Sequence, residues 1–170
     1  MKLSYSCLSN ISRIISKHNG KILREDTPNR PTCLCDQGTC PVDGKCEASG
    51  VVYQATVDSN GEVDKYVGLT ERRFLSRHKE HYTNFENRNP KNSTTLSRKI
   101  WNLEDNNANF EIKWKILQQC KPYKPGSAEC RLCLSEIYTI IFQPQEASLN
   151  SKSEIMGKCR HTNKFKLCKN

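Results

Sequence analysis

Residues 51–68 constrain the fold of this 170-residue chain more than any other stretch. Two runs rich in β-branched and aromatic residues flank a turn at Ser59-Asn60-Gly61. An Asn-Gly pair between such runs is typical of a two-residue hairpin turn, because both residues adopt positive φ angles readily. We therefore expect a β-hairpin that carries one tyrosine on each strand, Tyr53 and Tyr66.

A basic segment follows the hairpin, and residues 71–85 carry apolar side chains at helical spacing. A helix over this stretch turns four side chains toward one side: Phe74, His78, His81 and Phe85. Arg77 and His81 are four residues apart, so they share one face of that helix. The hairpin and this helix thus bring two tyrosines, an arginine and a histidine into one region.

The rest of the chain predicts four more elements. An amphipathic pattern near residues 8–15 favours a short N-terminal helix. Much later in the chain, Ser93 or Thr94 can cap another helix that begins directly after them. Residues 110–116 alternate between apolar and charged side chains, which is typical of a strand with one face on the core. A buried helix is predicted over residues 130–142, where apolar residues recur at helical spacing: Leu134, Ile137, Tyr138 and Ile141. After the N-terminal helix, the predicted order is β-β-α-α-β-α, an α+β fold.

The composition narrows the partners of the protein. The formal net charge is +9 and the pI is about 9.1, which favours binding to nucleic acid or another polyanion. A solvated basic surface explains the same charge, and charge alone does not separate the two. No apolar run approaches the roughly 20 residues that span a bilayer, and the segment Met1–Cys7 lacks an apolar signal core. We expect an intracellular protein that does not contact a membrane.

Ten cysteines in a chain without an export signal favour metal binding over disulfides, because thiols stay reduced inside cells. One group supplies the four thiolates that a tetrahedral zinc ion takes: Cys33, Cys35, Cys40 and Cys46. A second group combines a Cys-x-x-Cys with a later Cys-x-His: Cys130, Cys133, Cys159 and His161. Alternatively, Cys133 is a buried helix residue and Cys159 a surface thiol. Three cysteines are expected to ligate nothing: Cys7, Cys120 and Cys168.

Glu136 is the only carboxylate on the otherwise apolar helix predicted at residues 130–142. A buried carboxylate without a partner is costly, so Glu136 needs a cation, a metal ion or a place in a functional site. The alternative is that Glu136 faces solvent on the polar side of the helix, near Arg131 or Ser135.

The two tyrosines and the basic helix resemble the GIY-YIG nuclease module. The sequence has Val51-Val52-Tyr53 at the first signature, Tyr66-Val67-Gly68 at the second, and the Arg-x-x-x-His of the family at residues 77–81. The resemblance implies a GIY-YIG-like fold with a small three-stranded antiparallel sheet flanked by helices. It also implies a metal-binding glutamate on the helix after the third strand, matched by Glu136, and a later catalytic asparagine, matched by Asn150.

The resemblance further implies a metal-dependent endonuclease that hydrolyses phosphodiester bonds in DNA, with Mg²⁺ or Mn²⁺ as cofactor. Glu136 would hold the ion, since a hard cation prefers carboxylate and water oxygens. Arg77 offers a permanently charged fork of donors to phosphate oxygens. Tyr53 or Tyr66 takes a proton from the attacking water, or Tyr66 orients that water. His81 orients Tyr53 or contacts phosphate.

Further segments resemble the endonuclease region of Penelope-like retroelements, and the resemblance covers nearly the whole chain. These segments are the first cysteine group and residues 130–136, 149–154 and 158–165. Residues 3–7, Asn10 and His18-Asn19 resemble the segment that joins the reverse transcriptase of those elements to the nuclease. In that family, the nuclease nicks target DNA to prime reverse transcription. The resemblance implies a C-terminal fragment or separated module in the nucleus, with DNA and a reverse transcriptase domain of the same element as partners.

We therefore divide the chain into four parts. They are an N-terminal helix and linker (1–32), a cysteine-rich zinc segment (33–50), a GIY-YIG nuclease core (51–155) and a basic tail that contributes a cysteine and a histidine (156–170). A second hypothesis is a non-catalytic, zinc-containing nucleic-acid-binding module, the remnant of a decayed retroelement. The charge and the cysteines favour that alternative, whereas the joint presence of six candidate catalytic residues favours the nuclease.

Overall fold

The computed structural model of the chain describes residues 11–25, 33, 35, 40–121 and 130–151. The helices in these parts are α1 (Ile11–Glu25), α2 (Phe74–Asn87), α3 (Thr95–Asp105) and α4 (Arg131–Phe142), with two 3-10 turns, η1 (Pro90–Asn92) and η2 (Pro144–Glu146). The strands are β1 (Val51–Ser59), β2 (Glu62–Thr70) and β3 (Glu111–Gln119). After α1, the order of helices and strands is β-β-α-α-β-α, so the predicted α+β order is confirmed.

β1 and β2 form the expected hairpin around Asn60-Gly61. Both turn residues have positive φ angles, 54° at Asn60 and 87° at Gly61, which suits the right-handed twist of the strands. β3 pairs antiparallel with the other side of β1, so the strand order is β2-β1-β3. β1 is therefore the central strand of a small antiparallel sheet. β2 is an edge strand, whose outer hydrogen-bonding groups need other partners.

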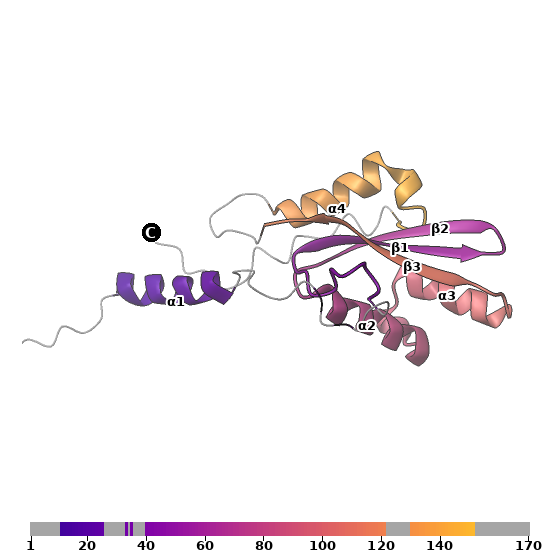
Figure 1. Cartoon of the computed structure of the whole chain (residues 1–170), viewed down its shortest axis with the longest axis horizontal. Coiled ribbons are helices and arrows are strands. Elements are labelled where there is room, and N and C mark those ends of the chain that lie inside the picture. Colours follow the sequence, from indigo (N-terminus) through magenta and orange to yellow (C-terminus); the bar gives the residue numbers. More distant parts are fainter. Residues whose placement is uncertain (1–10, 26–32, 34, 36–39, 122–129, 152–170) are drawn as a thin grey trace, which may run out of the picture.

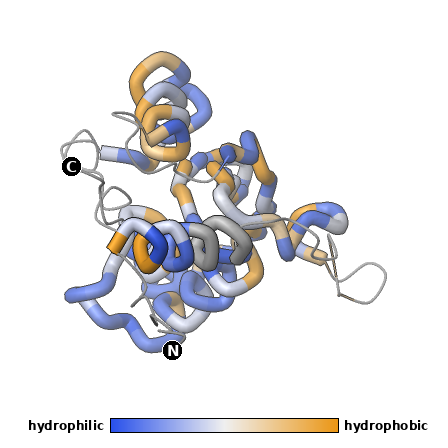
Figure 2. Tube along the Cα trace, turned by 90° about the vertical axis from the view of Figure 1, so that its left-hand side faces the viewer, coloured by the Kyte–Doolittle hydropathy of each residue, from blue (hydrophilic) through white to orange (hydrophobic). Residues whose placement is uncertain are grey.

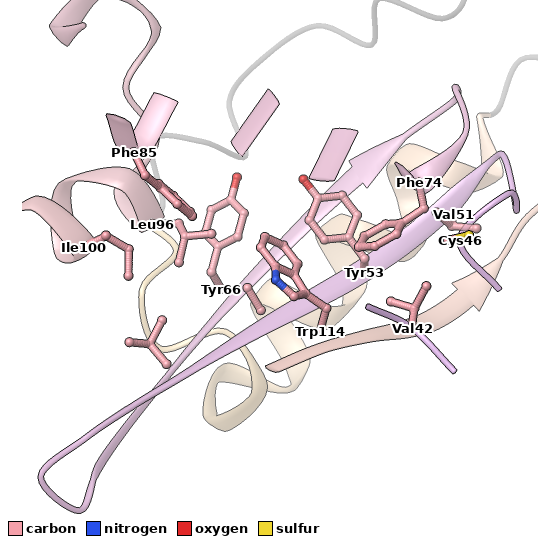
Figure 3. Close-up of a cluster of buried hydrophobic side chains, with 12 residues drawn as sticks. Val42, Cys46, Val51, Tyr53, Tyr66, Phe74, Phe85, Leu96, Ile100 and Trp114 are labelled. Atoms are coloured by element: carbon pink, nitrogen blue, oxygen red, sulfur yellow. The ribbon is translucent and has the colours of Figure 1, made fainter. Parts of the chain in front are cut away.

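The sheet separates two sets of helices, with α2 and α3 on one face and α4 on the other (Figure 1). Successive side chains of each strand point to opposite faces. The face toward α2 carries the larger core, which includes Tyr53, Tyr66 and Trp114 (Figure 3). The face toward α4 carries a smaller cluster with Val52 and Val67. Both candidate tyrosines thus lie on the α2 side of the sheet.

Helix α2 begins at Phe74, so the expected start near residue 71 is wrong. Arg73 has extended backbone angles and makes no side-chain cap. The first N–H groups of the helix donate to carbonyl groups of the segment before β1, from Phe74 to Ala48 (2.8 Å) and from Leu75 to Cys46 (2.8 Å). The inner face is as predicted, with buried Phe74, His81 and Phe85 and a half-buried His78.

Thr94, rather than Ser93, caps helix α3. The Thr94 hydroxyl accepts a hydrogen bond from the Ser97 N–H (3.1 Å), and the Ser97 hydroxyl accepts one from the Thr94 N–H (2.7 Å). This reciprocal pair is a capping box that satisfies two N–H groups at the start of the helix. The alternating pattern after α3 is also confirmed, because β3 buries Trp114 and exposes the lysines on either side.

Helix α4 has nearly the predicted bounds but not the predicted burial. Leu134, Tyr138 and Ile141 are 48%, 54% and 49% exposed, whereas Leu132 and Thr139 are buried. Hydrophobic residues occur on all the coils of this short helix (Figure 2), so helical spacing alone does not identify the face that meets the sheet. The expectation that Leu134, Tyr138 and Ile141 are buried is therefore wrong.

Helix α1 extends well past the amphipathic pattern near residues 8–15. Its residues Ile11 and Ile14 are exposed.

In the described ranges, no helix combines the length and the apolar character that crossing a membrane requires.

Candidate active site and metal centre

The hydroxyl group of Tyr53 is the centre of the candidate active site. It lies 2.7 Å from Nε2 of His81 and accepts a hydrogen bond from Nε of Arg77 (3.1 Å). The Tyr66 ring meets the His81 ring edge to face, with 6.0 Å between centroids. Figure 3 shows the two tyrosine rings rising from neighbouring strands with their hydroxyl groups on the same side. The structure thus brings together the four residues that carry the resemblance to the nuclease module.

Gly68 leaves room for the Tyr53 ring. The two residues are directly opposite each other on β1 and β2. A Cβ atom on Gly68 would lie 2.6 Å from the Tyr53 hydroxyl oxygen and 2.8 Å from Cζ, which is far inside van der Waals contact. The glycine that ends the Tyr-Val-Gly signature is therefore explained by close packing against the tyrosine of the other signature.

The electrostatics of this group follow from its burial. Burial, together with the smaller effects of the charges of Arg77 and His78, lowers the pKa of His81 to about 3. His81 is therefore neutral at physiological pH, and it orients the Tyr53 hydroxyl rather than offering a charge to phosphate. Burial also raises the pKa of Tyr53; Arg77 acts against this rise, and Glu136 and Glu80 add to it.

Arg77 keeps its charge in this setting. Burial alone would lower the pKa of Arg77, but Tyr53, Glu80 and Tyr66 together raise it above the usual value for arginine. Its side chain is 26% exposed, so the guanidinium group is held from within and still reaches the surface. Such a fixed, permanently charged fork suits an oxyanion such as phosphate.

Glu136 lies on α4, which covers the face of the sheet opposite α2 (Figure 1). The charge of Glu136 contributes to the raised pKa of Tyr53, after the larger effects of burial and Arg77. The residue is half-buried. This position is intermediate between the two sequence-based alternatives, a buried acid and a fully solvated one.

Asn150 clamps the outer edge of β2. Its side-chain oxygen accepts from the Val67 N–H (2.8 Å), and its side-chain nitrogen donates to the Val67 carbonyl (2.8 Å). The Leu149 N–H adds a bond to the Lys65 carbonyl (2.9 Å). Asn150 therefore satisfies the edge strand at the residue between Tyr66 and Gly68. These contacts hold the β2 backbone at the residue that separates Tyr66 from Gly68.

Arg72 and Glu80 also belong to this region, although the sequence analysis does not name them as site residues. The Glu80 carboxylate pairs with Arg72 (2.6 Å) and with Arg77 (3.1 Å), so it lies between two guanidinium groups. The spacing of Arg77 and Glu80, three residues apart on a helix, predicts the second pair. The pair with Arg72 has no local signal, because Arg72 precedes the helix.

The first cysteine group forms a compact cluster. The sulfur atoms of Cys33, Cys35, Cys40 and Cys46 all lie within 4.8 Å of one another. The Sγ of Cys46 is 3.4 Å from that of Cys35 and 3.6 Å from that of Cys33. Tetrahedral zinc, with Zn–S bonds of about 2.3 Å, separates its sulfur ligands by about 3.8 Å. The four cysteines can therefore hold a metal ion such as zinc with only small shifts.

Backbone geometry supports thiolate chemistry at Cys40. The Gly44 N–H donates to the Cys40 sulfur (3.1 Å) from a backbone with a φ of +81°, a conformation that favours glycine. Burial would raise the pKa of Cys40, but backbone N–H groups around it, including that of Gly44, lower it to about 7. A metal ligand must be deprotonated, so this turn favours the form that binds metal.

The cysteine cluster is part of the core rather than a separate appendage. Cys46 is fully buried and packs with Val42 among the side chains that cover the α2 face of the sheet. The next residue, Glu47, pairs with Arg73 at 2.9 Å, and its side chain is only 4% exposed. Together with the carbonyl groups that receive the Phe74 and Leu75 N–H groups, this pair ties the cluster to the start of α2.

The second predicted zinc group is only partly described. Cys130 and Cys133 lie in the small apolar cluster beside Cys120, whereas Cys159 and His161 lie outside the described residues. Within the described ranges, the first group is the only set of three or more cysteine, histidine or acidic residues close enough to share a metal ion. The expectation for the second group therefore stays a prediction.

Comparisons with known proteins give no further identification. No protein-family model matches this chain, and no curated protein or solved structure does so either.

Proposed function

We propose that this chain is a metal-dependent DNA endonuclease with a GIY-YIG-type fold. The observation that carries the proposal is the hydrogen-bonded group of Tyr53, His81 and Arg77, with Glu136 in electrostatic reach of it. A phosphodiester hydrolase needs a water activator, a cation for the charge that develops on phosphate, and a metal site. The four side chains are of the types that meet these needs. The net charge of +9 agrees with a polyanionic substrate.

Glu136 fits a site for Mg²⁺ or Mn²⁺ with a single protein ligand. Its half-buried carboxylate lies on a helix with no other acid, and these ions keep most of their water shell when bound. The bound ion would supply Lewis-acid stabilisation of the charge on phosphate. Arg77 would orient the same phosphate through those N–H groups of its guanidinium that do not bond to Tyr53 or Glu80. His81, neutral and 2.7 Å from the Tyr53 hydroxyl, holds that phenol in one orientation.

Proton removal from water falls to Tyr53 or Tyr66. The Tyr53 side chain is fully buried and its pKa is raised by that burial, whereas Tyr66 is 7% exposed. The single variants Tyr53→Phe and Tyr66→Phe separate the two roles. The variant that lacks the water-activating hydroxyl should lose cleavage and keep DNA binding. The other variant should change substrate affinity or protein stability instead.

Conversion of supercoiled plasmid to nicked or linear DNA tests the proposal. Cleavage should require added Mg²⁺ or Mn²⁺, and it should be lost in Arg77→Ala. The metal-free arm should omit the divalent ion rather than add a strong chelator, because a chelator would also remove metal from the cysteine cluster. Cleavage without divalent ions, or none with any of them, would count against the nuclease.

Binding without cleavage would favour the second hypothesis, a non-catalytic zinc-containing nucleic-acid-binding module. The cysteine cluster and the net charge suit that function as well. An origin in a Penelope-like retroelement, a nuclear location and a reverse transcriptase domain as partner belong to the same proposal. They rest on the sequence resemblance alone.

A further inference from the structure

The Glu80 carboxylate occupies the position that an external oxyanion would take between two arginines. Its Oε1 lies 2.6 Å from Nη2 of Arg72, and its Oε2 lies 3.1 Å from Nη1 of Arg77. The side chains of Arg72, Glu80 and Arg77 are 63%, 37% and 26% exposed. The group is therefore open to solvent on one side and continuous with the tyrosine cluster on the other.

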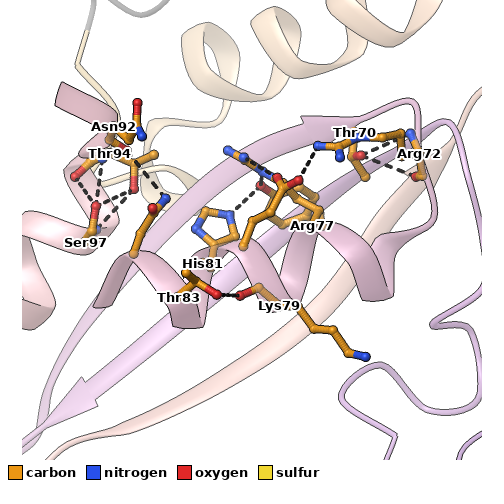
Figure 4. Close-up of polar contacts among 12 residues, drawn as sticks. Thr70, Arg72, Arg77, Lys79, His81, Thr83, Asn92, Thr94 and Ser97 are labelled. Carbon is orange, nitrogen blue, oxygen red and sulfur yellow. Dashed lines mark hydrogen bonds and ion pairs between the residues drawn. The ribbon is translucent and has the colours of Figure 1, made fainter. Parts of the chain in front are cut away.

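The Arg72 backbone and the Arg77 side chain are each anchored independently of Glu80. The Arg72 N–H donates to the Thr70 hydroxyl (3.2 Å), and that hydroxyl donates to the Arg72 carbonyl (3.3 Å), which fixes the turn after β2. Arg77 is anchored through its Nε, which donates to the Tyr53 hydroxyl. Figure 4 shows Thr70, Arg72 and Arg77 lined along this side of α2 with their polar contacts. The Arg77 guanidinium group thus keeps its anchor if the carboxylate moves away, and the backbone that carries the exposed Arg72 side chain stays in place.

We propose that Arg72 and Arg77 form a binding site for a DNA backbone phosphate, and that Glu80 is the internal counter-ion which this phosphate displaces. Arginine binds carboxylate and phosphate with the same donor geometry, so one oxyanion can replace the other. The pair of Glu80 with Arg72 is solvent-exposed and therefore weak, and Arg77 keeps its hydrogen bond to Tyr53 when the carboxylate leaves. The proposal rests on the proposed function, and it adds Arg72 and Glu80 to the residues that set substrate affinity.

Competition with Glu80 lowers the affinity of the site for any single phosphate. A duplex that offers several phosphates to the basic surface overcomes this competition, whereas a small anion does not. The site therefore favours a nucleic-acid backbone over inorganic phosphate.

The variant Glu80→Gln tests this displacement. It keeps the side-chain size and removes the competing charge, so binding to a fluorescein-labelled DNA duplex should tighten by roughly three- to tenfold. Fluorescence anisotropy without added divalent ions avoids cleavage, and omission of chelators preserves the cysteine cluster. Glu104→Gln is the matched control, because Glu104 pairs with Arg88 at 2.8 Å and has a side chain that is 38% exposed. We expect that control to change affinity less than twofold.

Arg72 provides the second arm of the experiment. Arg72→Gln should weaken binding and reduce the dependence of log Kd on log salt by about one unit, as expected for one lost phosphate contact. In the Arg72→Gln background, Glu80→Gln should gain much less than it does in the wild type. Thermal melts of all variants show whether the fold is intact.

The outcomes separate this inference from the proposed function. Equal effects of Glu80→Gln and Glu104→Gln, or wild-type affinity in Arg72→Gln, would overturn the phosphate site while leaving a nuclease possible. A wild-type protein that neither binds nor cleaves the duplex would overturn both. The displacement is supported if Glu80→Gln binds DNA more tightly, Glu104→Gln does not, and the gain disappears in the Arg72→Gln background.

Discussion

The ring of Tyr53 lies over Gly68 on the neighbouring strand, so closely that a Cβ atom there would be 2.6 Å from the tyrosine hydroxyl. The backbone of Gly68 is not in the left-handed region, so its reason to be glycine is space rather than φ. The same hydroxyl contacts His81 and Arg77, so the space at Gly68 sets the position of the whole group.

Gly68→Ala should therefore displace the Tyr53 ring and destabilise the protein by about 1–3 kcal/mol, the usual cost of overpacking. It should also lower cleavage more than this loss of stability explains. A double-mutant cycle with Tyr53→Ala measures the contact directly by urea unfolding. In the Tyr53→Ala background, Gly68→Ala should cost much less, because the ring is gone. Equal costs in the two backgrounds would show that the ring does not define the space.

Asn150→Asp tests the clamp on β2. The substitution replaces the nitrogen that donates to the Val67 carbonyl with an oxygen that repels it. We expect a loss of about 1–3 kcal/mol in unfolding free energy, because the carbonyl loses its donor and faces a charge. Exchange of the Val67 amide proton should accelerate, whereas Asn87→Asp at the exposed end of α2 should leave that amide unchanged. If the exchange rate of the Val67 amide proton is unchanged in Asn150→Asp, Asn150 does not hold β2 in place.

Local patterns predict the elements of this fold better than they predict its contacts. The turn at Asn60-Gly61, a cap at Ser93 or Thr94 and the alternating strand around Trp114 all depend on neighbours in sequence; all three are confirmed, with Thr94 as the cap. The buried face of α4 is wrong, because tertiary contact with a small sheet decides which apolar residues are covered.

The same distinction holds for the site. Tyr53, Tyr66, Arg77 and His81 are brought together as the motif predicts. The pair of Glu47 with Arg73 and the clamp of Asn150 on Val67 join segments distant in sequence. No local pattern identifies such pairs. The completing residues of the second cysteine group lie outside the described residues, so that prediction stays untested.

Stability should depend on pH through His81. Its pKa falls from the usual 6.5 to about 3 on folding, so between these values the unfolded chain binds a proton that the folded chain does not. This contribution is therefore complete above about pH 6.5 and is lost as the pH falls toward about 3, with a slope of about 1.4 kcal/mol per pH unit.

The variant His81→Leu isolates this contribution. Urea unfolding of both proteins across the window gives the difference in unfolding free energy at each pH. The difference should shrink as the pH falls, because only the wild type has an imidazole at this position that takes up a proton when the chain unfolds. A difference that stays constant with pH would mean that His81 is not held neutral in the fold.

Metal removal should loosen the start of α2. The cysteine cluster is tied to that helix through the Cys46 and Ala48 carbonyls, which accept from Leu75 and Phe74. Protein expressed with ample zinc should contain bound zinc, and chelation should accelerate exchange of the Phe74 and Leu75 amides while those within α3 stay protected. Cys46→Ser should have the same effect, and Cys120→Ala, outside the cluster, should retain the metal. Protein without zinc, or amides indifferent to chelation, would contradict this coupling.

Glu136→Gln should abolish cleavage and leave the fold and DNA binding nearly intact. The substitution keeps the side-chain volume and removes the charge proposed to hold Mg²⁺, so the cleavage rate should fall by at least ~10³-fold. Affinity should persist, because it rests mainly on lysine and arginine contacts with phosphate. A second effect needs no metal: the pKa of Tyr53 should fall, because the Glu136 charge raises it in the wild type. NMR titration of labelled tyrosine measures that shift, and Glu86→Gln on the exposed side of α2 is the control. Near-normal cleavage by Glu136→Gln, with a normal thermal melt, would place the metal site elsewhere.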